Sequence, residues 1–149
     1  LTRHQENGQP VFGYYWAPSG LMGAYDWLIL KEPPHTEGCR DKLTAAAEDP
    51  GLRPVDRACA YETVPIDKLA HKGLSRKAPE LADMLRRMNV GLEPLNTTLA
   101  WATQNGVQDS ETTAVYYLRT HEDRWEGWVT PKAYQEIKEA LKDFEPAQQ

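Results

Sequence analysis

The sequence contains one dense run of residues that favour β-strands, Val11-Phe-Gly-Tyr-Tyr-Trp16, with a proline on either side. The run ends in three consecutive large aromatic residues. Neighbouring side chains of a strand point to opposite faces, so Tyr15 cannot share a face with Tyr14 and Trp16. The run therefore predicts a strand with at least one face that is not ordinary core.

Two interpretations of this aromatic face remain open from the residues alone. In the first, Tyr15 packs inside and the other two rings pack against a helix. In the second, the face of Trp16 lines a ligand site. The electron-rich face of an indole attracts a cation that is weakly hydrated, and quaternary ammonium groups fit that description.

Further elements are expected on the C-terminal side of this run. Asp26–Leu30 predicts a second strand, stopped by two prolines, and Tyr61–Ile66 predicts a third at a sheet edge. Ser19–Tyr25 predicts a short helix or a turn. The stretch Pro34–Ala58 is rich in proline, glycine and charge, and we expect a long excursion in which Leu43–Ala47 is helical.

After Gly73 the apolar residues recur with a period of about 3.6, which predicts helices. Four apolar stripes follow one another, and the last begins at Thr130-Pro131, a typical helix start. Their members are Leu81, Met84, Leu85 and Met88; Leu92, Leu95, Leu99 and Ala102; Ala114, Tyr117, Leu118, Trp125 and Trp128; and Tyr134, Ile137, Leu141 and Phe144. We expect Trp125 and Trp128 to be core residues, since aromatic stripes at helical spacing usually pack.

Charge and hydropathy exclude two classes of protein. Seventeen basic and twenty-two acidic side chains give a net charge of −5 without an evident basic cluster, which argues against a nucleic-acid partner. The mean hydropathy is −0.67, and the apolar runs are far shorter than the ~20 residues of a membrane-spanning helix. The first ten residues are polar, so we expect no signal peptide within the chain.

Motifs for catalysis, cofactors or metals are not evident. The sequence has no GxSxG, GxxxxGK or GxGxxG, and its four histidines are scattered without metal-ligand spacing. We therefore expect no cofactor, no metal and no catalytic residue. The main alternative is a small α/β enzyme domain, a hydrolase or isomerase that uses His35, His71 or His121 with a carboxylate; the other is a structural remnant that binds no solute.

Two cysteines, Cys39 and Cys59, lie twenty positions apart. Paired, they would close a loop with few apolar residues of its own, a bridge worth about 3 kcal/mol in the chain-entropy model. From the residues alone, a disulfide and two free thiols are equally plausible.

Five stretches together resemble a known family. They are Tyr14-Tyr15-Trp16-Ala17-Pro18, Tyr25–Leu30, Glu32-Pro-Pro34, the stretch around Tyr61–Ile66, and Trp125-Glu-Gly-Trp128-Val129. The chain is similar to the C-terminal part of substrate-binding proteins of ABC transporters for glycine betaine, choline or proline. The length of the Pro34–Ala58 excursion is closer to the subgroup that resembles trimethylamine N-oxide binders.

The resemblance implies an α/β fold of the type II periplasmic-binding-protein class, incomplete here, with strands in the first half and helices in the second. It assigns residues 1–60 to the second lobe and residues 61–149 to the helical return into the first. It further implies that Trp16 is one wall of an aromatic box around a trimethylammonium group, with Tyr14 and Tyr15 as weaker candidates.

Partners and location follow from the same resemblance. It implies a solute-binding component, not an enzyme, at the periplasmic or extracellular face of the membrane, which presents a methylated osmolyte to an ABC permease. Family members are about twice as long, so we expect a missing N-terminal half or a second copy of the chain to complete the box. An oxidising compartment also favours a Cys39–Cys59 disulfide.

Overall fold

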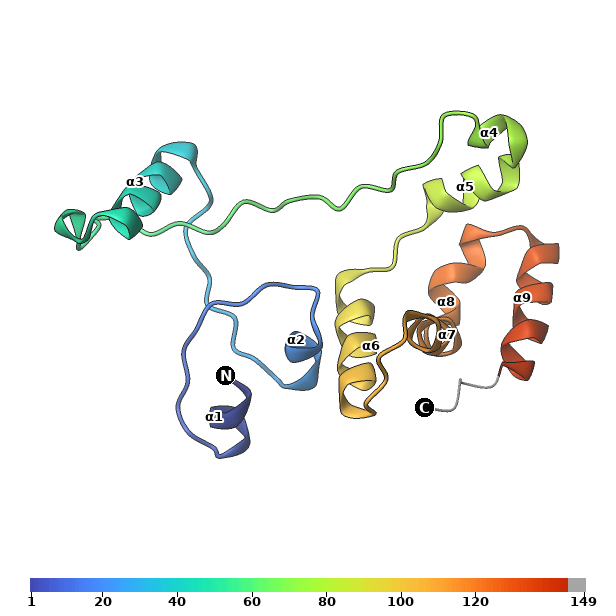
Figure 1. Ribbon diagram of the computed structural model, residues 1–149, viewed down its shortest axis with the longest axis horizontal. Coiled ribbons are helices and arrows are strands. Elements are labelled where there is room, and N and C mark those ends of the chain that lie inside the picture. The colour runs from blue at the N-terminus through green and yellow to red at the C-terminus, as the bar shows by residue number, and fades with distance from the viewer. Residues whose placement is uncertain (145–149) are drawn as a thin grey trace. The chain divides into compact units, whose positions relative to one another are not determined.

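The structure is a computed structural model that describes residues 1–144. It forms two compact units, one of residues Leu1–Trp27 with Ala70–Gln149, the other of Leu28–Leu69. The first unit holds α1 Thr2–Glu6, α2 Gly20–Ala24, α4 Leu74–Lys77, α5 Pro79–Arg87, α6 Leu92–Gln104, α7 Ser110–Thr120, α8 Glu122–Trp125, η2 Glu126–Trp128 and α9 Pro131–Asp143 (Figure 1). The second unit holds α3 Glu37–Glu48 and η1 Pro50–Leu52.

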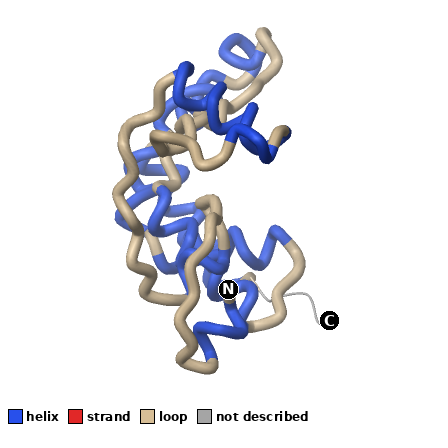
Figure 2. The backbone as a smooth tube through the Cα atoms, turned by 90° about the vertical axis from the view of Figure 1, so that its left-hand side faces the viewer, coloured by secondary structure: helices blue, strands red, loops and turns tan. Residues whose placement is uncertain are grey.

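The expected α/β fold is wrong for the described part of the chain. Residues 1–144 contain helices and loops but no strand (Figure 2), and the expected strands Val11–Trp16, Asp26–Leu30 and Tyr61–Ile66 are extended loops. A strand needs a neighbour whose N–H and C=O groups complete the ladder. One backbone hydrogen bond, from Ala60 N–H to Pro33 O at 2.8 Å, joins the two arms of the second unit, the segments that precede α3 and follow η1. The residues that favour strands are present, but residues 1–144 form no paired strand.

The helices of the second half follow the predicted apolar stripes. Pro79 and Pro131 each lie in the first turn of a helix, and the Thr130 hydroxyl caps α9 by accepting from Ala133 N–H. The third stripe, which runs from Ala114 to Trp128, is divided among α7, α8 and η2. The break lies at His121, whose φ of −125° and ψ of 46° are not helical. The chain therefore turns between Tyr117 and Trp125, and both rings remain in the interior of the unit.

Helices α2 and α6 approach so closely that α2 must present glycine to α6. A Cβ on Gly20 would lie 2.9 Å from Leu99 O, and one on Gly23 would overlap the backbone of Asn96. The N-terminal end of α2 is held against α6 by Asn96, whose Oδ1 accepts from Ser19 N–H at 2.8 Å. The Ser19 hydroxyl also caps α2 by accepting from Met22 N–H. The sequence Ser19-Gly20-Leu-Met-Gly23 thus attaches residues 1–27 to the helical part of the first unit.

We predict that Gly23→Ala lowers the free energy of unfolding by about 1–3 kcal/mol, because the added methyl group overlaps backbone atoms that cannot move aside. Gly38→Ala is the matched control. Gly38 lies in α3, and a Cβ there meets nothing within 4 Å, so alanine should stabilise by roughly 0.5–1 kcal/mol. Thermal melts of both variants measure the difference, and an unchanged Tm for Gly23→Ala would contradict the close approach.

A partly buried cluster of three polar side chains, Glu122, Tyr134 and Lys138, joins α8 to α9. Lys138 Nζ lies 2.6 Å from Glu122 Oε1, and the Tyr134 hydroxyl donates to the same carboxylate. The Lys138 ammonium, with the Tyr134 hydroxyl, holds the pKa of Glu122 below its usual range, and the hydrogen bond with Glu122 raises the pKa of Lys138. The carboxylate form of Glu122 is therefore favoured by folding.

Because the folded-state pKa of Glu122 is lowered, its stabilising contribution is present above the ordinary glutamate pKa and is lost as the pH falls through the folded value. We predict that Glu122→Gln lowers the Tm at pH 7 and that this difference shrinks toward zero in acid. Glu136→Gln, in the exposed Lys132–Glu136 pair at 3.7 Å, is the control and should change the Tm little at any pH. Thermal melts between pH 7 and acidic pH measure this difference in Tm. A Glu122→Gln difference that does not change with pH would refute the prediction.

The second unit is held together by the Cys39–Cys59 disulfide, which confirms the predicted pairing. The two Cα atoms lie 6.4 Å apart, and both cysteines are buried. Cys39 lies in the first turn of α3, where Thr36 caps the helix. On the C-terminal side, the Arg53 guanidinium donates to Ala46 O at 2.6 Å and to Ala47 O at 3.0 Å, so it satisfies carbonyls at the end of α3. The excursion folds as a disulfide-bonded helical loop.

Candidate functional site

The loop 11–18 presents the three consecutive aromatic residues Tyr14, Tyr15 and Trp16. Exposed fractions are 60% for Tyr14, 41% for Tyr15 and 62% for Trp16. The Tyr15 and Trp16 rings are stacked, with centroids 4.9 Å apart and planes within 10° of parallel. In a strand these two neighbours would point to opposite faces. In this loop they form a single exposed ring surface, which we call the aromatic loop surface.

The base of this loop is anchored by the short helix that follows it. The indole Nε1 of Trp27 donates to Leu21 O at 2.9 Å, and its ring contacts Tyr25 edge to face with centroids 5.6 Å apart. Through Gly20 and Gly23, α2 rests on α6 as described above. The aromatic loop surface is thus attached to an ordered part of the first unit, although the rings themselves are open to solvent.

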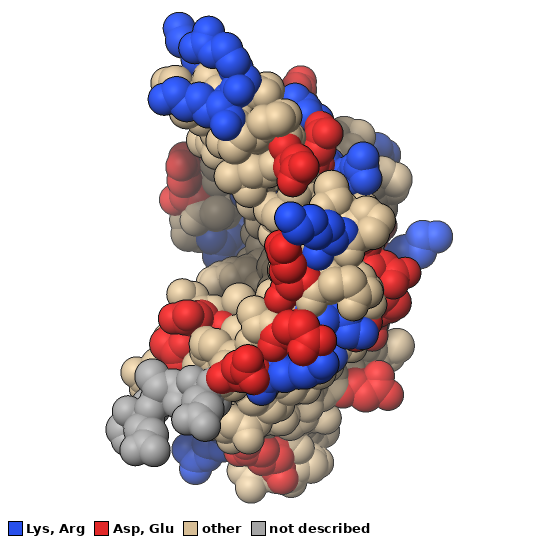
Figure 3. All heavy atoms as spheres, turned by 90° about the vertical axis from the view of Figure 1, so that its right-hand side faces the viewer, with Lys and Arg blue, Asp and Glu red and all other residues tan. Residues whose placement is uncertain are grey.

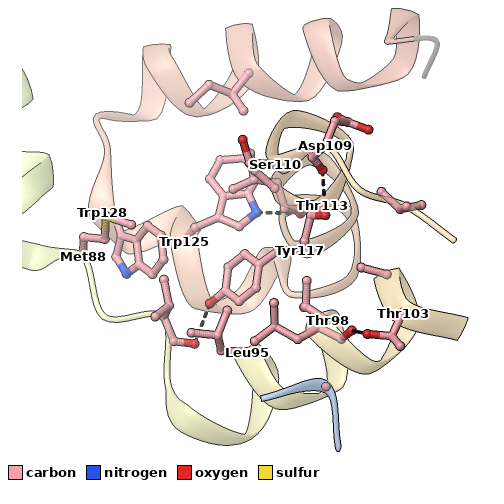
Figure 4. Close-up of a pocket in the computed structure, with 18 of the residues that line it drawn as sticks. Met88, Leu95, Thr98, Thr103, Asp109, Ser110, Thr113, Tyr117, Trp125 and Trp128 are labelled. Carbon is pink, nitrogen blue, oxygen red and sulfur yellow. Dashed lines mark hydrogen bonds between the residues drawn. The ribbon is translucent and has the colours of Figure 1, made fainter. Parts of the chain in front are cut away.

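A second aromatic group lies inside the first unit and lines a pocket of about 770 Å³. Its rings are Tyr117 on α7, Trp125 at the end of α8 and Trp128 in η2. Figure 4 shows the three rings grouped together, with the Tyr117 hydroxyl donating to a backbone carbonyl. Tyr117 and Trp128 are nearly parallel, with an interplanar angle of 19° and centroids 6.4 Å apart.

Trp125 is the most enclosed member of this group, with an exposed fraction of 1%. Its Nε1 donates to Leu118 O at 2.7 Å, and its ring lies 5.2 Å from that of Tyr134. The indole therefore contacts both α7 and α9, and its single polar group is satisfied. The predicted core role of Trp125 agrees with this burial, whereas Trp128 is only half-buried.

The pocket was not foreseen from the sequence, although its residues were. Met84, Met88, Leu95 and Ile137 were assigned to apolar helix stripes, and all of them line the pocket. Periodicity identifies which face of a helix is apolar, but it does not tell whether the facing helices close against one another. The available signal is one stripe with two methionines together with another that carries three aromatic rings, since methionine fills irregular spaces.

The histidines that an enzyme would use are divided between the two units. His35 lies in the second unit, whereas His71 and His121 lie in the first. His71 Nδ1 accepts from Gly73 N–H at 3.0 Å within its own turn, and the His121 ring lies 4.9 Å from Tyr117. Within residues 1–144, no three metal-binding side chains are grouped, and no helix is long and apolar enough to cross a membrane.

The surface charge is mixed. On the face shown in Figure 3, acidic and basic side chains lie beside one another over most of the area, and basic ones gather at one end. The ion pairs include Lys132–Glu136 at 3.7 Å and Arg86–Asp83 at 2.5 Å, both between exposed side chains.

We predict opposite consequences for truncating the two kinds of tryptophan. Trp125→Ala should cost about 3–5 kcal/mol of unfolding free energy, because it removes a fully buried ring and leaves a cavity. Trp16→Ala should change the unfolding free energy by less than about 0.5 kcal/mol, since the exposed ring leaves no cavity. Urea unfolding of both variants gives the two values directly, and a large loss for Trp16→Ala would show that the loop rings are structural.

Comparison with known families gives one match. The family model described as OpuAC, substrate binding domain of ABC-type glycine betaine transport system, matches residues 1–120. This range includes the aromatic loop surface, the whole disulfide-bonded unit and helices α4 to α7. Comparison with curated proteins and with solved structures gave no significant match.

Proposed function

The chain belongs to the family of substrate-binding domains of ABC-type glycine betaine transport systems, and we propose from this premise that it binds a methylated ammonium solute through Trp16. The family binds solutes and is not a family of enzymes. Substrate-binding domains of ABC importers work outside the cytoplasm and deliver the solute to a membrane permease. The Cys39–Cys59 disulfide is consistent with an oxidising compartment.

The observation that carries the proposal is the exposure and stacking of the Tyr15 and Trp16 rings on the aromatic loop surface. A trimethylammonium group is a weakly hydrated cation, and it gains most from the face of an indole. In the proposed role Trp16 supplies the main contact and Tyr15 supports its ring from behind. Tyr14 is a further candidate at the rim. The solute would be glycine betaine, choline or trimethylamine N-oxide.

One ring wall is not sufficient for tight binding. A cation on a desolvated aromatic ring gains about 2 kcal/mol, whereas micromolar affinity requires about 8 kcal/mol. We therefore propose that further walls come from outside residues 1–149, either from another segment of the binding protein or from a second copy of the chain.

Exposed apolar side chains in each unit support a partner surface of this kind. In the second unit, Leu28 is 88% exposed and Leu69 is 94% exposed, on arms that have β-forming sequence but no ladder. In the first unit, Phe12 beside the aromatic loop surface is 85% exposed. Large apolar groups gathered at the surface mark sites of interaction. We propose that the loop around Phe12 pairs with the element that completes the box.

The proposal predicts weak, cation-dependent binding by residues 1–149. Glycine betaine, choline and trimethylamine N-oxide should each bind with a dissociation constant above about 1 mM, an interaction of less than ~4 kcal/mol. Titration followed by NMR of the indole N–H signals measures binding in this range. The signal of Trp16 should shift with choline and shift far less with 3,3-dimethyl-1-butanol, the uncharged isostere of choline.

Variants and sedimentation complete the test. Trp16→Ala should remove the choline response, and Trp16→Phe should keep part of it because a ring remains. Equal responses to choline and its uncharged isostere, or an unchanged response in Trp16→Ala, would exclude Trp16 as a cation site. Micromolar binding by a species that sediments as a monomer would show that residues 1–149 already contain the whole box.

A further inference from the structure

We infer that the pocket between α5, α6, α7 and α9 is a second binding site, and that its ligand is a small, uncharged, largely apolar molecule. The pocket belongs entirely to the first unit and is distinct from the aromatic loop surface. Its volume of about 770 Å³ falls within the range of small-molecule sites, roughly 300–1,000 Å³. Neither the family match nor the proposed function assigns it a ligand.

The three threonine hydroxyl groups in the pocket wall are already used by the protein, and the other side-chain hydroxyl and amide groups that line it outside the rings, those of Ser110 and Gln108, belong to exposed residues. Thr98 donates to Pro94 O at 2.8 Å, Thr103 to Leu99 O at 2.9 Å, and Thr113 to Asp109 O at 2.9 Å. Each of these bonds returns to the helix backbone one turn earlier. The donors of these threonines are therefore already paired with backbone carbonyls.

Two of the three aromatic donors in the wall are used in the same way. Tyr117 donates to Val90 O at 2.8 Å, and Trp125 donates to Leu118 O at 2.7 Å. Burial raises the pKa of the Tyr117 phenol, so it remains a neutral donor to that carbonyl. What the rings offer to a ligand is their apolar faces and edges.

One residue of the pocket wall, Asp109, carries a charge, and its carboxylate already accepts a hydrogen bond from the backbone. Among the described residues that line the pocket, Asp109 alone is ionisable to a full charge near neutral pH. Its Oδ1 accepts from Thr112 N–H at 2.6 Å at the start of α7, and this backbone hydrogen bond lowers its pKa. The carboxylate is thus committed to capping the helix.

These features select against glycine betaine, one of the solutes proposed for Trp16. Glycine betaine carries a carboxylate, and the described wall has no lysine, arginine or histidine to pair with it. A polar ligand would exchange its full hydration for the few hydrogen bonds that Gln108, Ser110 and the Trp128 indole offer, and each of its polar groups left without a partner costs free energy. An apolar molecule loses no hydrogen bonds and covers the side chains of Met84, Leu95 and Ile137. The wall chemistry therefore fits hydrocarbon or aromatic groups.

Binding of N-phenyl-1-naphthylamine tests the inference. This probe is uncharged and fluoresces in apolar surroundings. Added to residues 1–149, it should give a saturable signal with one site per chain, and an excess of glycine betaine should not displace it. Because that control uses the proposed solute, failure of this site and failure of the Trp16 site are distinguishable.

A pocket-filling variant locates the site. Ala114 lines the pocket from α7 and is exposed at its mouth, so Ala114→Trp should fill the space with little strain and weaken probe binding at least tenfold. Ala140→Trp is the matched control, because Ala140 is exposed on α9 and does not line the pocket; it should bind as the unmodified chain does. If Ala114→Trp fails to fold by circular dichroism, Ser110→Trp, at another exposed lining position, takes its place.

Three results would overturn the inference. They are the absence of saturable binding, an equal loss in the pocket-filling variant and in Ala140→Trp, and undiminished binding in the pocket-filling variant. Sedimentation at the same protein concentration identifies a further case. A chain that dimerises and binds no probe would show that a second copy, not a small molecule, covers the apolar wall.

Discussion

Burial of the Trp125 indole is the constraint on which the first unit depends. The ring follows the non-helical turn at His121, and its Nε1 bond to Leu118 O fixes α8 against α7. On its other side the ring contacts Tyr134 on α9. The Glu122–Lys138 pair holds the same two helices, α8 and α9, together from the surface. Packing, hydrogen bonding and charge thus all specify the turn between α7 and α8. This turn places the rings of Tyr117, Trp125 and Trp128 on one wall of the pocket.

The second unit uses a different source of order, since most of its large apolar side chains are exposed and do not form a core. Its buried side chains are Cys39, Ala46 and Cys59, and two of the three form the disulfide. A bridge of this kind stabilises mainly by restricting the unfolded chain, by about 3 kcal/mol for a loop of this length. The contrast explains how a segment rich in proline, glycine and charge remains ordered.

Residue patterns predicted the helices better than the strands, for a physical reason. A helix satisfies its own backbone, so the apolar period, Pro79, Pro131 and the Thr130 cap are enough to locate its start and its buried face. A strand depends on a partner that local sequence does not reveal. Val11–Trp16 has the composition of a strand and becomes a loop in which Tyr15 and Trp16 stack. The disulfide was predictable as a pairing because two cysteines allow one intramolecular connection.

The two aromatic groups show how similar residues become suited to different ligands through their surroundings. Trp16 is exposed, with a ring face that water covers until a weakly hydrated cation replaces it. Trp125 and Tyr117 are enclosed, and their polar atoms are bound to backbone carbonyls. The first arrangement leaves a ring face open to solvent, and the second encloses its rings among apolar side chains. Sequence composition alone cannot separate these cases, since both consist of tryptophan and tyrosine at short spacing. The turns between helices make the distinction, because they determine which rings are buried and which carbonyls accept from them.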